Sequence, residues 1–220
     1  DINCENIDFA YEEEQILKDY SISIPKGSRI GIHGKSGSGK STLAGLAARL
    51  YDASEGEVLI DGKNVKDYSF RGLYDKMGYV TQKAVLFSDT IEGNVAFGEA
   101  AQAITEEDVK KAIDISQAQE FIDTKKKKYR SPISQGGSNV SGGQKQRLSI
   151  ARAIAKHPDV YIFDDSFSAL DYKTDAVLRK ELKAKTKDST VMIVAQRIST
   201  ILHADRILVL DEGKVVGMGT

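Results

Sequence analysis

The sequence lacks several features that would point to particular classes of protein. Cys4 is the single cysteine, which excludes an internal disulfide or a cysteine-rich metal site and is compatible with a reducing compartment. No stretch of about 18 apolar residues occurs, so we expect no membrane-spanning helix. The formal net charge of −1 provides no bulk attraction for nucleic acid. No signal-peptide pattern opens the chain.

What remains is the composition of an ordinary globular protein. The 220 residues are 40% hydrophobic and 29% charged, which is enough to bury a core in one large domain or two small ones. The first residues, Asp1 to Cys4, read as the middle of a strand and lack an initiating Met. We therefore expect a domain that belongs to a longer protein.

The most specific pattern lies between Gly34 and Thr42. It reads Gly-Lys-Ser-Gly-Ser-Gly-Lys-Ser-Thr, so that Gly34 is followed after four residues by Gly-Lys-Ser. A β-type run precedes the pattern and a run with helical spacing follows it. This strand–loop–helix context is the one that a phosphate-binding loop requires. An ordinary glycine turn is the alternative, and the register of Lys40 and Ser41 with the glycines argues against it.

The loop predicts how a nucleoside triphosphate would be held. Its glycines allow a tight turn in which successive N–H groups point at phosphate oxygens, and the helix that begins near Lys40 adds its positive dipole end. Lys40 would neutralise the β- and γ-phosphates, and the Ser41 hydroxyl would hold Mg²⁺. The predicted nucleotide-binding residues of the loop are Gly34, Lys35, Ser36, Gly37, Ser38, Gly39, Lys40, Ser41 and Thr42.

Four further residues are candidates for the same nucleotide. Tyr11 ends a strand-like opening and is either a half-buried aromatic or, beside a phosphate loop, a ring that stacks on adenine. Gln82 follows a predicted strand, and its amide is either solvated, a ligand of Mg²⁺ or an orienting group for water. Asp164 and Asp165 end a buried-type strand, where a carboxylate is the expected partner of Mg²⁺.

Residues 83–156 lose the β-type runs and predict helices. Thr105, followed by acidic residues, resembles a helix start. The lysine run 125–128 reads as a solvated loop, with a polyanion contact as the alternative.

Ser141 occupies the N-cap position of a strongly helical run over 144–157. By itself the sequence Ser141-Gly142-Gly143 is a flexible cap. Beside a phosphate loop in the same chain, it becomes a second anion-binding helix start.

The ordered motifs resemble the nucleotide-binding domain of ATP-binding-cassette (ABC) transporters over nearly the whole chain. The matching stretches, in chain order, are Tyr11 as the adenine-stacking aromatic, Gly34 to Thr42 as Walker A, Gln82 as the Q-loop, Ser141-Gly142-Gly143-Gln144 as the signature, Asp164 as the Walker B aspartate and Ser168-Ala169-Leu170-Asp171 as the D-loop. The signature discriminates best, because many ATPases have Walker A and few have the signature. The run Leu86 to Ile91, with Asn94, suggests the exporter branch.

The resemblance implies an α/β fold: a P-loop NTPase (RecA-like) core with an antiparallel β subdomain and an inserted α-helical subdomain. The chain would form a single nucleotide-binding domain over 1–220. Its core would span about 1–82 and 157–220, and its helical subdomain about 83–156.

The resemblance also implies ligands and partners. ATP and Mg²⁺ would bind, with Ser41, Gln82 and Asp164 at the metal. The signature would contact ATP in trans, on a second nucleotide-binding domain, and the D-loop would form part of the dimer contact. A transmembrane domain, fused N-terminally, would place the assembly at the cytoplasmic face of the cell membrane, and no nucleic acid is expected.

Three departures from the family pattern concern Val140, Asp165 and Gln196. The first is a mild change from Leu. Asp165 stands where the family has a glutamate general base, and its carboxylate reaches about 1.5 Å less far. A misplaced base can forfeit much of the roughly 10²–10⁴-fold that general-base catalysis contributes. Gln196 stands where the family has a switch histidine, and it can donate a hydrogen bond but cannot carry an imidazolium charge.

Lys40, Asp165 and Gln196 are therefore the predicted catalytic residues of a weakly hydrolytic site. This combination resembles the degenerate-site subunit of heterodimeric multidrug exporters.

The leading interpretation is the ATP-driven motor domain of an exporter, in which two such domains sandwich two nucleotides. A regulatory module that binds nucleotide without hydrolysing it remains open because of Asp165 and Gln196. A soluble ABC-type ATPase acting on DNA would need a long coiled coil, and residues 83–156 are too short and lack heptads. A small-molecule kinase leaves the signature unexplained.

Overall fold

The computed structural model describes residues 1–98 and 102–220, and residues 99–101 of the predicted helical segment lie outside this description. It confirms the α/β fold class. The central sheet has six strands in the order β12 (Lys214–Gly219), β11 (Arg206–Asp211), β3 (Arg29–Gly34), β10 (Thr190–Val194), β9 (Val160–Asp164) and β6 (Met77–Val80). All neighbours are parallel except the β11–β12 pair. Every residue of β9 and β10 is buried, as in parallel sheets covered on both faces.

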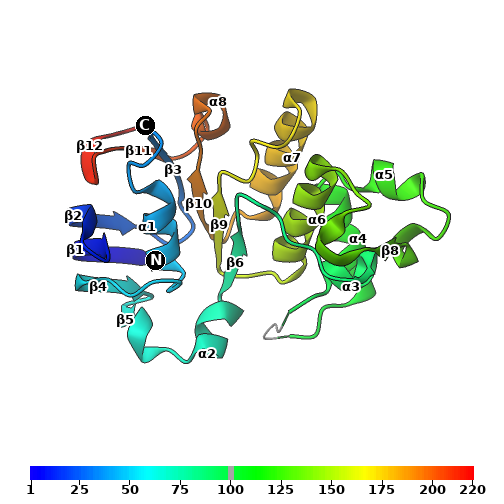
Figure 1. Cartoon of the computed structure of the whole chain (residues 1–220), viewed down its shortest axis with the longest axis horizontal. Helices are drawn as coiled ribbons and strands as arrows, with labels where there is room; N and C mark the ends of the chain where they lie inside the picture. Colours follow the sequence, from blue (N-terminus) through cyan, green and yellow to red (C-terminus); the bar gives the residue numbers. More distant parts are fainter. Residues whose placement is uncertain (99–101) are drawn as a thin grey trace.

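A second, antiparallel sheet lies beside the central one at the blue end of the molecule (Figure 1). Its order is β2 (Glu14–Ile24), β1 (Ile2–Tyr11), β4 (Glu55–Ile60) and β5 (Lys63–Asn64). The helix α1 (Lys40–Ala47) shares one hydrophobic cluster with residues of both sheets, including Ile7 of β1 and Ile32 of β3. The helix α1 is therefore packed against both sheets.

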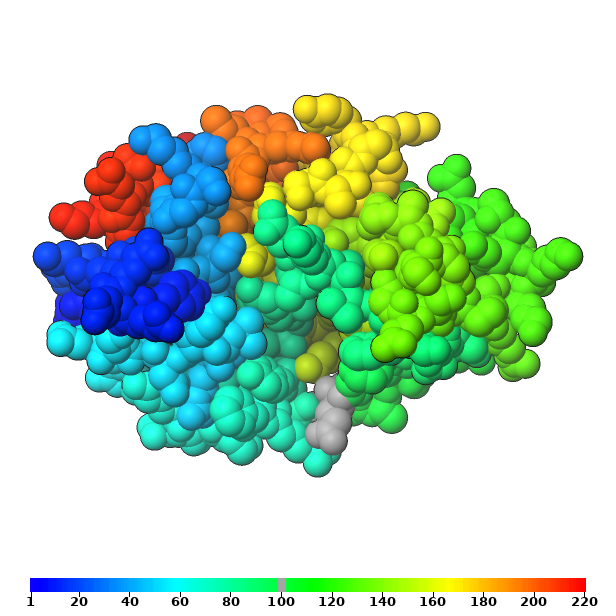
Figure 2. Space-filling view, viewed as in Figure 1, coloured from blue at the N-terminus to red at the C-terminus, as the bar shows by residue number. Residues whose placement is uncertain are grey.

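The helical segment forms the opposite, green end of the molecule (Figures 1 and 2). Its helices are α3 (Ile91–Val95), α4 (Glu106–Ile115), α5 (Gln119–Asp123) and α6 (Gly142–Ala155), with 3₁₀ turns at Lys128–Arg130 and Gln135–Gly137. A second hydrophobic cluster joins this segment to β9 and to α7 (Tyr172–Lys185), for example through Leu148 and Phe163. The remaining helical turns are Val65–Asp67, α2 (Phe70–Asp75) and α8 (Ile198–Ile201).

One expectation for the helical segment is wrong. Residues 83–156 are not free of strands, because β7 (Asp89–Thr90) pairs antiparallel with β8 (Pro132–Ile133). Strands of two residues are too short to show a hydrophobic period, so the sequence pattern could not reveal them.

Both helix starts that the sequence suggests in this segment are present with reciprocal caps. Thr105 accepts from the Asp108 amide and Asp108 accepts from the Thr105 amide at α4. Ser141 and Gln144 make the equivalent pair at α6. Each cap satisfies N–H groups that a helix start otherwise leaves without partners.

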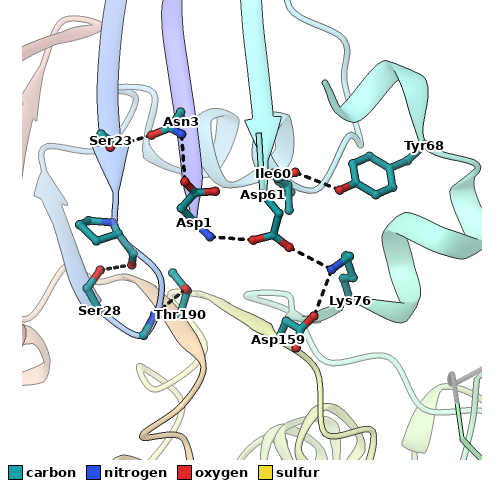
Figure 3. A network of polar contacts seen from close by, with 12 residues as sticks. Asp1, Asn3, Ser23, Ser28, Ile60, Asp61, Tyr68, Lys76, Asp159 and Thr190 are labelled. Carbon is teal, nitrogen blue, oxygen red and sulfur yellow. Dashed lines mark hydrogen bonds and ion pairs between the residues drawn. The ribbon is translucent and has the colours of Figure 1, made fainter. Parts of the chain in front are cut away.

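A polar network joins the antiparallel sheet to the central sheet at the edge shown in Figure 3. Lys76, just after α2, donates to Asp61 at the end of β4 (2.9 Å) and to Asp159 before β9 (3.2 Å). On the same side, the Thr190 hydroxyl accepts from the Gly27 amide at 3.1 Å. Exposed ion pairs contribute little stability, so this network mainly sets how the two sheets are oriented.

Candidate nucleotide site

The loop between β3 and α1 needs glycine at two positions for different reasons. A Cβ atom on Gly34 would lie 2.2 Å from the carbonyl oxygen of Leu210, so no side chain fits. Gly39 has φ 96° as the N-cap residue of α1, a conformation that glycine adopts without strain. These constraints let the chain turn from the end of β3 into the helix within a few residues.

Lys40 lies inside this loop rather than in solvent. Its Nζ donates to the carbonyl oxygens of Gly34 (2.9 Å) and Lys35 (2.5 Å). Burial lowers the pKa of Lys40, and the carboxylates of Asp165 and Asp164 partly oppose that change. An anion bound at the loop would further favour the charged ammonium.

A buried carboxylate lies opposite the start of α1. Ser41 Oγ donates to Asp164 Oδ1 at 2.8 Å, and the Tyr79 hydroxyl donates to Asp164 Oδ2 at 3.3 Å. Burial raises the pKa of Asp164 above its ordinary value, these two hydrogen bonds lower it, and the neighbouring Asp165 raises it further. A buried carboxylate beside a hydroxyl is a hard, oxygen-only donor set that would gain a favourable counter-charge from a divalent cation, so these residues fit Mg²⁺.

Asp165 is turned toward the same space by an unusual backbone. Its φ is 46°, in the left-handed region that Asp tolerates better than most residues, and its N–H donates to the carbonyl oxygen of Val194 at 2.9 Å. Its side chain accepts from Gln82 Nε2 at 3.1 Å. The loop after β6 and the end of β9 therefore meet through two residues that the sequence singles out.

Tyr11 presents an exposed ring beside the loop. Tyr11 is 40% exposed, and its ring lies nearly perpendicular to the rings of Phe9 (centroids 4.8 Å apart) and Tyr51 (5.3 Å). Its hydroxyl lies 3.4 Å from Thr42 Oγ1. A partly exposed ring that is held in place by aromatic neighbours can stack on a flat base.

These residues line one cavity of about 280 Å³. Its walls are Tyr11, Ile16, Ser36, Gly37, Gly39, Lys40, Ser41, Thr42, Gln82, Asp165, Val194 and Gln196. Ile16 and Val194 were not predicted from the sequence, since both read as ordinary apolar residues of strands. Only their position across the folded sheets brings them to the cavity.

Three residues of the predicted loop do not line the cavity. Gly34 and the buried Ser38 form its supporting turn. The Lys35 side chain is 82% exposed and forms an ion pair with Asp211 at 3.4 Å, so it points away from the cavity.

The signature residues and the D-loop residues do not line this cavity either. Ser141 and Gly142 are exposed at the start of α6, and a Cβ atom on Gly143 would lie 3.3 Å from the carbonyl oxygen of Ala169. The predicted D-loop ends at Asp171, which caps α7 by accepting from the Thr174 amide at 2.9 Å. The two motifs thus adjoin each other on a surface apart from the cavity.

Other expectations concern groups away from the cavity. Cys4 is buried and free, and burial raises its pKa to about 12, which keeps it protonated. Most of the lysine run 125–128 is exposed, and Lys128 pairs with Asp123 at 3.3 Å.

None of the helices within 1–98 and 102–220 combines the length and apolar character of a membrane span. In the same residues, no group of three or more His, Cys, Asp or Glu side chains forms a metal cluster.

Comparison with known proteins gives concordant matches. Residues 17–168 match the family described as ABC transporter. An ABC transporter ATP-binding protein of Mycobacterium tuberculosis is 43% identical over 206 residues, covering 93% of this chain and 35% of that protein. A putative multidrug export ATP-binding/permease protein of Staphylococcus aureus is 41% identical over 221 residues, covering 100% of this chain and 38% of that protein.

A solved structure gives the same result at the level of the fold. The ATP-bound structure of a bacterial Atm1-family ABC exporter superimposes with a TM-score of 0.94 and 36% identity, over 100% of this chain and 38% of that chain. The chain thus spans between 35% and 38% of the length of these relatives.

Proposed function

The chain belongs to the ABC transporter family, and we propose that it is the ATP-binding and ATP-hydrolysing motor domain of an exporter. One observation carries the proposal: Lys40, Ser41, Gln82 and Asp165 line a single cavity, with Asp164 bonded to Ser41 at its edge. These are the groups that phosphoryl chemistry on a bound nucleotide requires. The names of the relatives, an export ATP-binding/permease protein and an ABC exporter, support the transport role.

In this proposal the phosphates lie in the glycine loop and Lys40 exchanges its carbonyl partners for phosphate oxygens. Ser41, Asp164 and the amide oxygen of Gln82 would hold Mg²⁺. When bound, the metal ion neutralises charge on the transferring phosphoryl group. The partly exposed ring of Tyr11 stacks on the adenine.

Asp165 acts as the general base in this scheme, and Gln196 contacts the γ-phosphate. Asp165 accepts a hydrogen bond from Gln82, which holds its carboxylate at the cavity wall. The shorter Asp side chain and the neutral Gln196 favour slow turnover, so we assign the chain to the degenerate site of a heterodimer. A regulatory module that binds without hydrolysing is the second candidate, favoured by the same two residues.

A second nucleotide-binding domain completes each site. Ser141 and Gly142 are exposed at the start of α6, outside the cavity of their own chain. We assign Ser141, Gly142, Gly143 and Gln144 to the nucleotide of the partner domain. The adjoining segment Ser168, Ala169, Leu170 and Asp171 is assigned to the dimer contact. A soluble ABC-type ATPase acting on DNA is disfavoured, because the helices of the middle segment are short, with 10 residues in α4 and 14 in α6.

A transmembrane domain is the other proposed partner, which places the assembly at the cytoplasmic face of the membrane. An exposed apolar patch near Gln82 suits such a contact. Val85, Phe87 and Phe97 are 57%, 41% and 49% exposed, and the two Phe rings stack with centroids 4.1 Å apart. Contiguous exposed apolar groups commonly mark interaction surfaces.

The test uses the full-length protein with its partner subunit. A photoreactive ATP analogue labelled on the α-phosphate marks each chain that holds nucleotide, and the ADP fraction on that chain reports hydrolysis. We expect Mg²⁺-dependent labelling of this chain and a roughly 10–100-fold loss of affinity in Lys40→Ala, the scale of one lost charged hydrogen bond. Lys26→Ala, an exposed lysine in a turn, is the matched control. Labelling that is absent, or equal in Lys40→Ala, would refute the proposal.

A further inference from the structure

The strand that leads into the phosphate loop carries a histidine that the proposed function does not use. Ile30 and Ile32 of β3 belong to the hydrophobic cluster around α1. Because strand side chains alternate, Gly31 and His33 face the other side of the sheet. Consistent with this, a Cβ atom on Gly31 would lie 2.5 Å from the Cβ of Ile201 in α8. The half-buried His33 thus lies under the loop that follows β10.

His33 continues the β3–β10 ladder beyond its last strand pair. The register ends at Ile32 opposite Val194, and the Ala195 amide still donates to the carbonyl oxygen of Ile32 at 3.0 Å. The next contact is made by a side chain: His33 Nδ1 lies 3.2 Å from the carbonyl oxygen of Ala195. A carbonyl oxygen can only accept, so Nδ1 carries the proton and donates.

The residue held in this way directly precedes Gln196, which lines the nucleotide cavity. On the other side of Gln196, Arg197 Nη2 donates to the carbonyl oxygen of Ser168 at 3.1 Å. The Arg197 guanidinium also lies 5.1 Å from the ring centroid of Tyr172. Gln196 therefore lies between two anchored neighbours, and His33 supplies the anchor on the strand side.

We propose that His33 is a positioning residue for hydrolysis: its Nδ1–H holds the Ala195 carbonyl so that the Gln196 amide faces the γ-phosphate. This role rests on the proposed function, which assigns Gln196 to the nucleotide. His33 does not touch the cavity and so acts through Gln196. Loss of the bond should leave nucleotide binding intact and slow the chemical step, because the phosphate loop keeps its own contacts.

Three substitutions separate the hydrogen bond from simple packing. His33→Val keeps a β-forming side chain but removes the donor. In His33→Asn, the amide nitrogen lies the same number of bonds from Cβ as Nδ1 does, so the bond is restored. In His33→Gln, the donor lies one bond farther out and misses the Ala195 oxygen. His203→Asn, at an exposed histidine, is the matched control.

The measurement uses the full-length protein with its partner and the α-labelled photoreactive ATP described above. We expect single-turnover conversion of ATP to ADP on this chain to fall about five- to tenfold in His33→Val and His33→Gln, the scale of one hydrogen bond. His33→Asn and His203→Asn should match the wild type. ATP affinity should stay unchanged in all four variants. In a Gln196→Ala background, His33→Val should have no further effect, because both changes disable the same contact.

The outcomes distinguish this inference from the proposed function. If the wild-type chain binds and hydrolyses ATP but His33→Val, His33→Asn and His33→Gln all behave alike, the positioning role is overturned. An undiminished effect of His33→Val in the Gln196→Ala background would overturn it as well. A wild-type chain that takes up no label refutes the proposed function instead. Should His33→Val fail to fold, the comparison of His33→Asn with His33→Gln still decides.

Discussion

Ser41 Oγ donates to Asp164 Oδ1 across 2.8 Å, which joins two residues 123 positions apart in the chain. Ser41 is the second residue of α1 and Asp164 is the last residue of β9, so the bond requires the strand order of the central sheet to be in place. The pair also concentrates two oxygen donors beside the ammonium of Lys40. The contribution of the Ser41–Asp164 pair to folding stability and to metal binding can therefore be tested separately from phosphate binding by the glycine loop.

Asp164→Asn should raise the stability of the nucleotide-free chain near neutral pH. Burial raises the pKa of Asp164 above 3.8, so the folded state binds the proton more tightly than the unfolded state. Stability therefore falls as the pH rises from the unfolded pKa through the raised folded pKa, and Asn removes this loss. Urea unfolding should show the variant more stable at about pH 7, with the difference closing toward about pH 4.

The same variant should lose the Mg²⁺ dependence of ATP binding, because Asn lacks the negative charge that a divalent cation prefers. Asp188→Asn, at an exposed position, is the control for both measurements. An Asp164→Asn chain that is no more stable than wild type at neutral pH would show that the hydrogen bonds from Ser41 and Tyr79 already offset burial.

Substitutions of Tyr11 should separate its ring from its hydroxyl. Tyr11→Phe keeps the stacking face and loses only the 3.4 Å contact with Thr42, so ATP affinity should change less than about twofold. Tyr11→Ala removes the ring and should weaken binding by about fivefold or more, since stacking a base contributes roughly 1–3 kcal/mol. Calorimetric titration of the two variants measures the difference. Equal ATP affinities in Tyr11→Phe and Tyr11→Ala would show that Tyr11 does not stack on the adenine.

Ser141→Ala tests whether the signature acts on the partner domain. Ser141 is exposed and outside its own cavity, so ATP affinity of the isolated chain should stay the same. In the assembled transporter, hydrolysis at the partner's site should fall about tenfold, the scale of one charged hydrogen bond. Ser138→Ala, exposed just before the signature, is the control. Weaker ATP binding by the isolated Ser141→Ala chain would instead mean that α6 serves its own nucleotide.

Restoring the family's usual residues should accelerate hydrolysis at this chain's site. Asp165→Glu moves the carboxylate outward by one methylene, and Gln196→His restores an imidazole at the cavity wall. Together they should raise single-turnover hydrolysis by about tenfold or more, within the range that general-base catalysis contributes. The gain should exceed the product of the single gains, because base and phosphate contact serve one transition state. Unmodified turnover as fast as the partner's would show that Asp165 already reaches the water.

Local sequence patterns predicted much of the fold. The loop from Gly34 to Thr42 and the caps at Thr105 and Ser141 are short-range signals, each read from residues no more than eight positions apart. The buried strand β9 was predicted from the apolar run that ends at Asp164. The pairing of β7 with β8 joins segments that are far apart in sequence, and no local period marks it.

In the candidate site, too, the sequence identifies individual residues but not the contacts that the fold creates between them. The sequence names Gln82 and Asp165 separately, but their 3.1 Å contact joins residues 83 positions apart and depends on how β6 and β9 lie in the sheet. Lys35 belongs to the motif by position, yet its side chain points away from the cavity and pairs with Asp211 at the end of β11. Which way a loop side chain points depends on neighbours that a motif does not contain.

The hydrogen bonds from Lys40 to the carbonyl oxygens of its own loop have a consequence for the thermodynamics of nucleotide binding. Lys40 is buried and its ammonium has acceptors within its own loop, so a bound phosphate would replace these carbonyl oxygens rather than bulk water. The enthalpy gained is then the difference between phosphate and carbonyl acceptors, not the full strength of a new bond. The same bonds tie the Lys40 side chain to its loop, so this side chain has less conformational entropy left to lose when nucleotide binds.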